Sequence, residues 1–136
     1  MNSKIEWNGM MKFKATSGSG HDVFMDTSDQ NGGEDSAGRP KELLLHGLGG
    51  CTGMDVISIL KKMRQEPNSF YMDIEADQTE EHPMVFNQIH ITYHFSGDDL
   101  DEEKVRRAVE LSQTKFCGVS EMLRKTAKIT YEIKYE

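Results

Sequence analysis

Two cysteines carry the chemistry that this sequence could perform. Cys51 and Cys117 are the only cysteines in the 136-residue chain and lie sixty-six positions apart. A thiolate is a nucleophile and a metal ligand, whereas a neutral buried thiol behaves as a small hydrophobic group. The pair is therefore either a redox couple or two inert core residues. For a single free cysteine, the inert alternative is the commoner one.

The sequence around Cys117 favours a reactive thiol. Cys117 follows the basic Lys115 and precedes a short helix that we expect at residues 119–125. A nearby cation and a helix N-terminus both stabilise a thiolate, so this setting predicts a lowered pKa for Cys117.

The sequence around Cys51 favours a neutral thiol. Cys51 lies in an apolar, glycine-rich segment, and Asp55 follows one helical turn later on the same face, where its charge would oppose ionisation. Gly49 and Gly50 could instead break the helix and place Cys51 at a new helix N-terminus, which would stabilise the thiolate. The two cysteines match neither a zinc-binding spacing nor a C-x-x-C motif, so we expect no metal site.

Periodicity along the chain predicts one α+β domain over residues 1–136, in the order βββ-α-ββ-α-α-β. A long helix beginning at Pro40 is apolar on several sides, so we expect it to be central, buried and packed on an antiparallel sheet. The expected elements are strands near residues 4–7, 10–15 and 22–26, a loop at 27–39, the helix at 40–64, a strand hairpin at 71–77 and 85–96, helices at 98–115 and 119–125, and a final strand at 127–135.

Composition and charge exclude several classes of protein. A formal charge of −7 argues against an electrostatic surface for nucleic acid. No stretch approaches the roughly 20 apolar residues that a membrane span needs. The N-terminus lacks the apolar core of a signal peptide, so we expect a cytoplasmic protein. Because the cytoplasm keeps thiols reduced, a transient disulfide is more plausible there than a permanent one.

The cysteines and their flanks resemble the OsmC/Ohr family of osmotically inducible and organic hydroperoxide resistance proteins. The resemblance rests on Pro40, residues 42–45, the segment Gly47-Leu48-Gly49-Gly50-Cys51, the motif Cys117-x-x-Ser120 and the terminal strand. It covers nearly the whole chain in the family's order. The fold that it implies is an intertwined homodimer with active sites at the subunit interface.

The resemblance also implies a mechanism. Cys51 would be the peroxidatic thiol, which attacks a small hydroperoxide and becomes a sulfenic acid. Cys117 would be the resolving thiol, which condenses with Cys51 to a disulfide that a dithiol then reduces. Glu42 is a third candidate catalytic residue. This chemistry implies no metal and no organic cofactor.

Two positions depart from the family pattern. Better studied members place a glutamate directly after the proline, where this chain has Lys41, with Glu42 one residue later. On a straight helix Glu42 and Cys51 would lie on opposite faces, and only a break at the glycines could bring them together. Residues 1–38 also lack the arginine that the family uses to activate the thiol. Possible substitutes are Lys12, Lys14, Arg39 and Lys41.

These departures leave three alternatives. The first is a thiol-dependent peroxidase that acts as a homodimer. The second is a dimer of the same fold without peroxidase activity, which binds a small apolar or thiol-bearing ligand. The third is a structural or interaction dimer in which both cysteines are inert.

Overall fold

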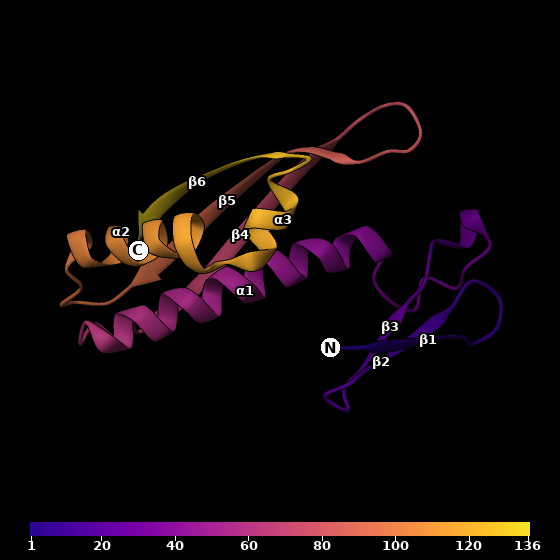
Figure 1. Cartoon of the computed structure of the whole chain (residues 1–136), viewed down its shortest axis with the longest axis horizontal. Helices are drawn as coiled ribbons and strands as arrows, with labels where there is room; N and C mark the ends of the chain where they lie inside the picture. Colours follow the sequence, from indigo (N-terminus) through magenta and orange to yellow (C-terminus); the bar gives the residue numbers. More distant parts are fainter. The chain divides into compact units, whose positions relative to one another are not determined.

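The computed structural model describes all 136 residues, whose contacts form two compact units, Met1–His46 and Gly47–Glu136. Figure 1 shows the elements of each unit. Their order is β1–β2–β3–α1–β4–β5–α2–α3–β6, which confirms the predicted α+β arrangement. The expectation of one domain over residues 1–136 stays a prediction.

The N-terminal unit contains an antiparallel meander of β1 (Ser3–Trp7), β2 (Phe13–Ser17) and β3 (Asp22–Met25), as predicted. The β1–β2 turn requires Gly9, whose φ of 87° lies in the left-handed region that glycine adopts without strain. Strand register places the apolar side chains on one face of this sheet, namely Ile5, Trp7, Phe13, Ala15, Val23 and Met25. Four of these six remain substantially exposed.

A buried carboxylate organises the loop that follows β3. Asp26 is 3% exposed and accepts hydrogen bonds from the backbone N–H groups of Thr27, Glu34 and Ser36 and from the Ser36 hydroxyl. These bonds, with the Ser36 hydroxyl contributing most, hold the pKa of Asp26 well below its ordinary value. Gly33 packs so closely on Asp26 and Thr27 that a Cβ atom would clash with them. The loop also contains a short 3₁₀ turn, Asp29–Asn31.

Helix α1 (Pro40–Lys62) runs without interruption through its glycines. The break that the sequence allowed at Gly49 and Gly50 is therefore absent, and Cys51 lies within the helix rather than at a new N-terminus. Gly49 and Gly53 instead permit close packing on β4, because a Cβ on either would meet Ile74 or Met72 at about 3 Å.

Helix α1, predicted to be the central and buried helix, is buried along one face only in the single chain. Its buried residues form one stripe, comprising Leu48, Gly49, Thr52, Gly53, Val56 and Leu60, whereas Met54 is 77% exposed. By length and composition α1 could cross a membrane, contrary to the expectation that no segment approaches a span. The core helix of a soluble domain meets the same criteria, and α1 packs on β4 as such a helix does.

The C-terminal unit is a three-stranded sheet with helices along one face (Figure 1). It contains the strands β4 (Ser69–Gln78), β5 (Phe86–Ser96) and β6 (Lys128–Tyr135) and the helices α2 (Glu102–Leu111) and α3 (Gly118–Leu123). The β4–β5 hairpin is antiparallel as predicted, but β6 pairs with β5 in parallel. The expectation of an antiparallel sheet is corrected to a mixed sheet, because α2 and α3 form a crossover connection that returns the chain in the same direction.

Strand β5 provides the centre of the core. Ile89, Ile91, Tyr93 and Phe95 point to one face of the sheet and are at most 1% exposed. The other fully buried apolar side chains of this unit come from α1 and α2, namely Leu48, Val56, Leu60, Val105, Ala108 and Val109. At the start of α2, Asp101 caps the helix by accepting hydrogen bonds from the N–H groups of Glu103 and Lys104.

Replacing Asp26 with asparagine should lower the stability of the N-terminal unit at neutral pH. A carboxylate with a depressed pKa contributes stability that is present above its unfolded value of about 3.9 and is lost as pH falls towards the folded value. Thermal unfolding of Asp26→Asn and wild type should therefore differ most near pH 7 and converge below about pH 4. Glu34→Gln, an exposed carboxylate in the same loop, is the matched control. A pH-independent difference would contradict this role for the Asp26 charge.

Candidate functional site

The fold brings the two cysteines together. The sulfur atoms of Cys51 and Cys117 and a carboxylate oxygen of Asp55 all lie within 4.8 Å of one another. Both thiols are free. Cys51 is partly accessible, whereas Cys117 is only 4% exposed. A sulfur separation of this size allows a disulfide to form after a modest movement, because the bond itself measures about 2.05 Å.

An unusual turn after α2 positions Cys117. Residues Ser112–Phe116 form a π-helical turn, and the Cys117 N–H donates to the Ser112 carbonyl at 2.8 Å. Cys117 then caps α3, and its sulfur accepts a hydrogen bond from the Ser120 N–H at 3.4 Å. Short π-helical segments inserted after α-helices recur at functional sites. Here the extra residue in the turn determines where α2 ends and where the thiol lies.

The structure reverses the expected shift in the pKa of Cys117. Burial is the largest effect and raises the pKa above the ordinary value, and Cys51 adds to the rise. The side chain and N–H of Ser120 act in the opposite direction without overcoming burial. Lys115 is not among the causes of this shift, and its ammonium lies over the exposed ring of Phe116 at 5.2 Å. The expectation was wrong because the burial comes from tertiary packing.

Asp55 lies beside both thiols, as the helical spacing from Cys51 indicated. The Ser112 hydroxyl donates to Asp55 Oδ2 at 3.0 Å and thereby orients the carboxylate. Within the C-terminal unit no lysine, arginine or histidine forms an ion pair with Asp55. The site therefore places a carboxylate next to two thiols without a compensating cation from this unit.

A buried polar network supports the thiol site. Thr52 Oγ1 lies 2.7 Å from both the Tyr93 hydroxyl and the Ser112 hydroxyl. The Gln113 side-chain amide donates to the Tyr93 hydroxyl at 2.7 Å and to Thr52 at 3.3 Å. Burial raises the pKa of Tyr93 to about 12, so this residue remains a neutral phenol. The network joins α1, β5 and the π-helical turn.

Arg124 extends the network to the end of α3. Its Nη2 donates to the backbone carbonyl of Gln113 at 3.1 Å and to the Gln113 side-chain oxygen at 3.3 Å. Its other terminal nitrogen lies 3.4 Å from Glu121. Nη2 thus holds the end of α3 against the turn that precedes Cys117, whereas the contact with Glu121 lies within α3.

Glu42 has a structural partner at the start of α1. Its carboxylate accepts a hydrogen bond from the Arg39 N–H at 2.7 Å. Glu42 is the third helical residue, the position from which a glutamate caps the N–H of the residue before the helix. Its proposed catalytic role stays a prediction.

Two of the basic residues considered as substitutes for the family's arginine form ion pairs within the N-terminal unit. Arg39 pairs with Asp35 at 2.7 Å, and Lys14 lies 3.6 Å from Asp22. These ion pairs neutralise part of the positive charge on Arg39 and Lys14 that would be needed to stabilise a thiolate.

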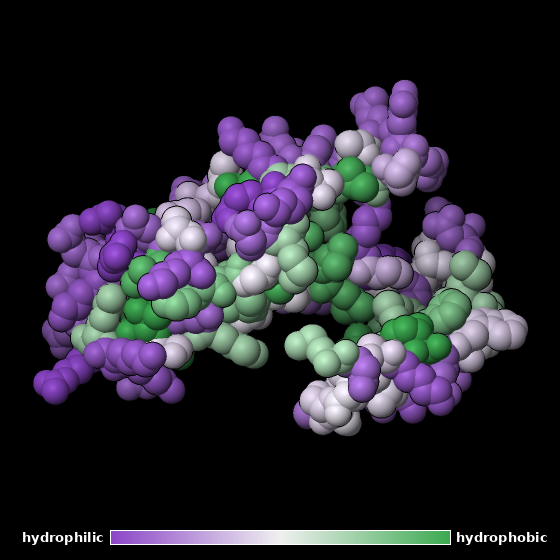
Figure 2. Space-filling model, in the orientation of Figure 1, coloured by the Kyte–Doolittle hydropathy of each residue, from purple (hydrophilic) through white to green (hydrophobic).

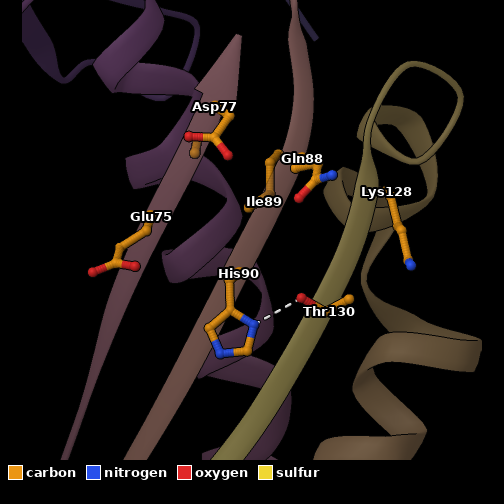
Figure 3. Close-up of a pocket in the computed structure, with 8 residues that line it drawn as sticks. Glu75, Asp77, Gln88, Ile89, His90, Lys128 and Thr130 are labelled. Carbon is orange, nitrogen blue, oxygen red and sulfur yellow. Dashed lines mark hydrogen bonds between the residues drawn. The ribbon is translucent and has the colours of Figure 1, made fainter.

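A polar pocket of about 150 Å³ lies on the sheet in the C-terminal unit and is a second candidate site. Figure 3 shows His90 and Thr130 on adjacent strands, with Glu75 and Asp77 on the next strand. His90 Nδ1 lies 2.7 Å from Thr130 Oγ1, and His90 Nε2 lies 3.5 Å from Glu132. This pocket contains no thiol, so it is a weaker candidate for nucleophilic chemistry.

Comparisons with known proteins agree with this fold. A family model described as OsmC-like protein matches residues 33–132. Protein YhfA of Escherichia coli (strain K12) is 37% identical over 131 residues, covering 96% of this chain and 95% of that protein. A hypothetical protein from Aquifex aeolicus VF5 has a similar solved structure, with a TM-score of 0.82, 31% identity and coverage of 99% of this chain and 96% of that one.

More distant structures share the fold. The organic hydroperoxide resistance protein OhrB of Bacillus subtilis superposes with a TM-score of 0.68 at 18% identity, covering 98% of each chain. The fold and the adjacent thiols thus define an α+β protein with a cysteine pair, one member of which lies within the long helix α1. The chain belongs to the OsmC-like protein family, as the cysteine pattern indicated.

Sequence reasoning missed most of the residues that hold the site together. Thr52, Tyr93, Gln113 and Arg124 lie on separate elements, and no spacing in the sequence relates them. The one indication of a further site residue in the sequence was the four-residue spacing of Cys51 and Asp55, which places Asp55 on the same helix face as Cys51.

Replacing Thr52 with valine should lower the free energy of unfolding by about 1–3 kcal/mol, because a buried hydroxyl network loses its shared partner. Urea denaturation monitored by circular dichroism measures this change. Thr130→Val is the matched control, since Thr130 is exposed and its hydroxyl bonds only His90. An equal decrease in the free energy of unfolding in both variants would show that the buried network does not stabilise the protein more than an exposed hydrogen bond does.

Proposed function

We propose that this protein is a thiol-dependent peroxidase that reduces small organic hydroperoxides. The observation that carries the proposal is the proximity of Cys51 and Cys117, whose sulfurs lie within 4.8 Å although the residues are sixty-six positions apart in the sequence. Structural similarity to organic hydroperoxide resistance proteins supports the substrate class. The dithiol chemistry itself requires no bound cofactor.

The reaction would proceed in two steps at the cysteine pair. The Cys51 thiolate attacks the outer peroxide oxygen, the O–O bond breaks, and the alcohol leaves with a proton, so that Cys51 becomes a sulfenic acid. The Cys117 thiol then attacks the Cys51 sulfur, forming the disulfide and releasing water. A dithiol reductant restores both thiols by exchange.

Accessibility supports this assignment of roles. Cys51 is partly exposed, so a peroxide can approach its sulfur, whereas Cys117 is buried. The raised pKa of Cys117 also suits a resolving thiol better than the attacking one. Because Asp55 lies beside both thiols and pairs with no cation of the C-terminal unit, we assign activation of Cys51 to a cation that the partner subunit supplies.

We also propose that the protein acts as a cytoplasmic homodimer. Apolar side chains reach the surface of both units, as the hydrophobic areas in Figure 2 illustrate. One such surface is the apolar face of the N-terminal sheet. Another is a groove of about 620 Å³ beside α1, lined by Gly49, Gly50, Gly53, Met54, Ile57, Ser58, Lys61, Phe70 and Met72. Large uncovered apolar surfaces of this kind are typical of interaction sites.

The same groove favours a second candidate function. If the thiols do not react with peroxides, the apolar lining formed by Met54, Phe70 and Met72 would suit a small apolar or thiol-bearing ligand. The lack of a cation beside the thiols within the C-terminal unit is consistent with that alternative. Thermal-shift measurements with a panel of such ligands distinguish it, provided that peroxide turnover is absent.

The two cysteine variants should fail at different steps. With cumene hydroperoxide and a dithiol reductant, Cys51→Ser should lose turnover completely. Cys117→Ser should consume about one equivalent of peroxide and accumulate a sulfenic acid that dimedone traps. Stopped-flow kinetics and intact-mass spectrometry measure both outcomes. Wild-type protein without turnover, or Cys51→Ser indistinguishable from wild type, would refute the proposed peroxidase.

Placing a charge in the groove should weaken the homodimer. Met54→Lys introduces an ammonium group at an exposed apolar position of α1. Burying this charge in a dimer interface would be costly, so the variant dimer should dissociate at a higher protein concentration than the wild-type dimer. Sedimentation equilibrium over a concentration series measures the change. Asn87→Lys adds the same charge at an exposed polar position of β5 and should leave association unchanged. A monomeric wild type would contradict the proposal.

A further inference from the structure

We infer that Cys51, Asp55 and Cys117 together form a binding site for Zn²⁺ in the reduced protein. This inference goes beyond the proposed peroxidase, since metal binding requires the two thiols and the carboxylate but no peroxide. Sequence spacing gave no indication of it, because the ligands come from α1 and from the start of α3. Folding brings together three ligands whose spacing in the sequence matches no zinc-binding motif.

The three donor atoms have the spacing that a zinc ion needs. All three lie within 4.8 Å of one another. In a tetrahedral site with Zn–S bonds of about 2.3 Å, two sulfurs lie roughly 3.7 Å apart. The ligands therefore need to approach by only about 1 Å, a smaller movement than a disulfide of about 2.05 Å requires.

The types of donor select the metal. Thiolates favour zinc and other soft cations over magnesium or calcium, which prefer oxygen ligands alone. Two cysteines and one carboxylate form a set of three protein ligands. Zinc sites with three protein ligands keep a fourth position for water or substrate. The partial exposure of Cys51 and Asp55 leaves an approach to that position.

Charge and orientation support the same conclusion. Three groups that become anionic in a metal site lie together, and no cation in the C-terminal unit forms an ion pair with Asp55. A divalent cation would compensate this charge. The Ser112 hydroxyl donates to Asp55 Oδ2 at 3.0 Å, as partners of metal-ligating carboxylates do. Thr52 in turn bonds Ser112, so the buried network fixes the orientation of the ligand.

Zinc binding and disulfide formation would exclude each other. Both use the same two sulfurs, so the reduced protein would hold the metal and the oxidised protein would not. The bound metal would also shield Cys51 from peroxide. Metal occupancy would therefore regulate access to the thiols, if the thiols prove redox-active.

Competition with a chromogenic chelator, under anaerobic conditions and with fully reduced protein, tests the inference. We expect one Zn²⁺ per chain, and Co²⁺ in its place should give the near-ultraviolet charge-transfer absorption of thiolate ligands. Cys51→Ser and Cys117→Ser should abolish this band. Asp55→Asn should weaken Zn²⁺ affinity at least 10-fold, and Ser112→Ala should weaken it about 10- to 100-fold.

The polar pocket on the sheet that contains His90 provides the matched control. His90→Ala removes the histidine of the other candidate cluster (Figure 3) and should leave Zn²⁺ affinity unchanged. The absence of a thiolate band in wild-type protein, or affinity that falls in His90→Ala but not in Asp55→Asn, would overturn the inference. Peroxidase turnover is measured separately in the presence of a chelator, so that either proposal can fail without the other.

Discussion

The buried hydrogen bonds of Thr52 are the constraint on which the thiol site depends. Thr52, Tyr93 and Ser112 are fully buried, so each hydroxyl needs a partner within the protein. They find one another across α1, β5 and the π-helical turn. An alternative placement of the turn on α1 would leave these groups unsatisfied in a medium of low dielectric constant. The network therefore determines where Cys117 lies relative to Cys51.

Asp55 gives this site its electrostatic character. A carboxylate lies beside two thiols, and no cation of the C-terminal unit pairs with it. Both proposals supply the missing positive charge. In the proposed peroxidase, a cation of the partner subunit would stabilise the Cys51 thiolate. In the metal complex, Zn²⁺ supplies the positive charge directly.

The order of elements and the family were predictable from the sequence, because they depend on local periodicity and on the residues around Cys51 and Cys117. The direction of β6 was not predictable from its own sequence, since alternation is the same in parallel and antiparallel pairs. The extent to which α1 is buried was also overestimated. Hydrophobicity alone does not reveal which apolar side chains are covered by other residues of the same chain.

The site itself was only partly predictable. Helical spacing correctly placed Asp55 beside Cys51. The pKa shift of Cys117 was predicted in the wrong direction, because the neighbouring charge of Lys115 is local whereas burial is a property of the folded unit. The π-helical turn and the contacts of Gln113 with Tyr93 depend on packing between distant segments. No periodicity encodes such contacts.

Peptide mapping of the oxidised protein is the most direct test of the central claim, that Cys51 and Cys117 form a reversible redox pair. A mixture of isotopically light and heavy reduced protein would receive one equivalent of cumene hydroperoxide and be digested without reduction. We expect a Cys51–Cys117 disulfide within single chains, without light-to-heavy pairs, which a dithiol removes. Two free thiols after treatment, or disulfide-linked peptides that join light to heavy chains, would contradict the redox pair.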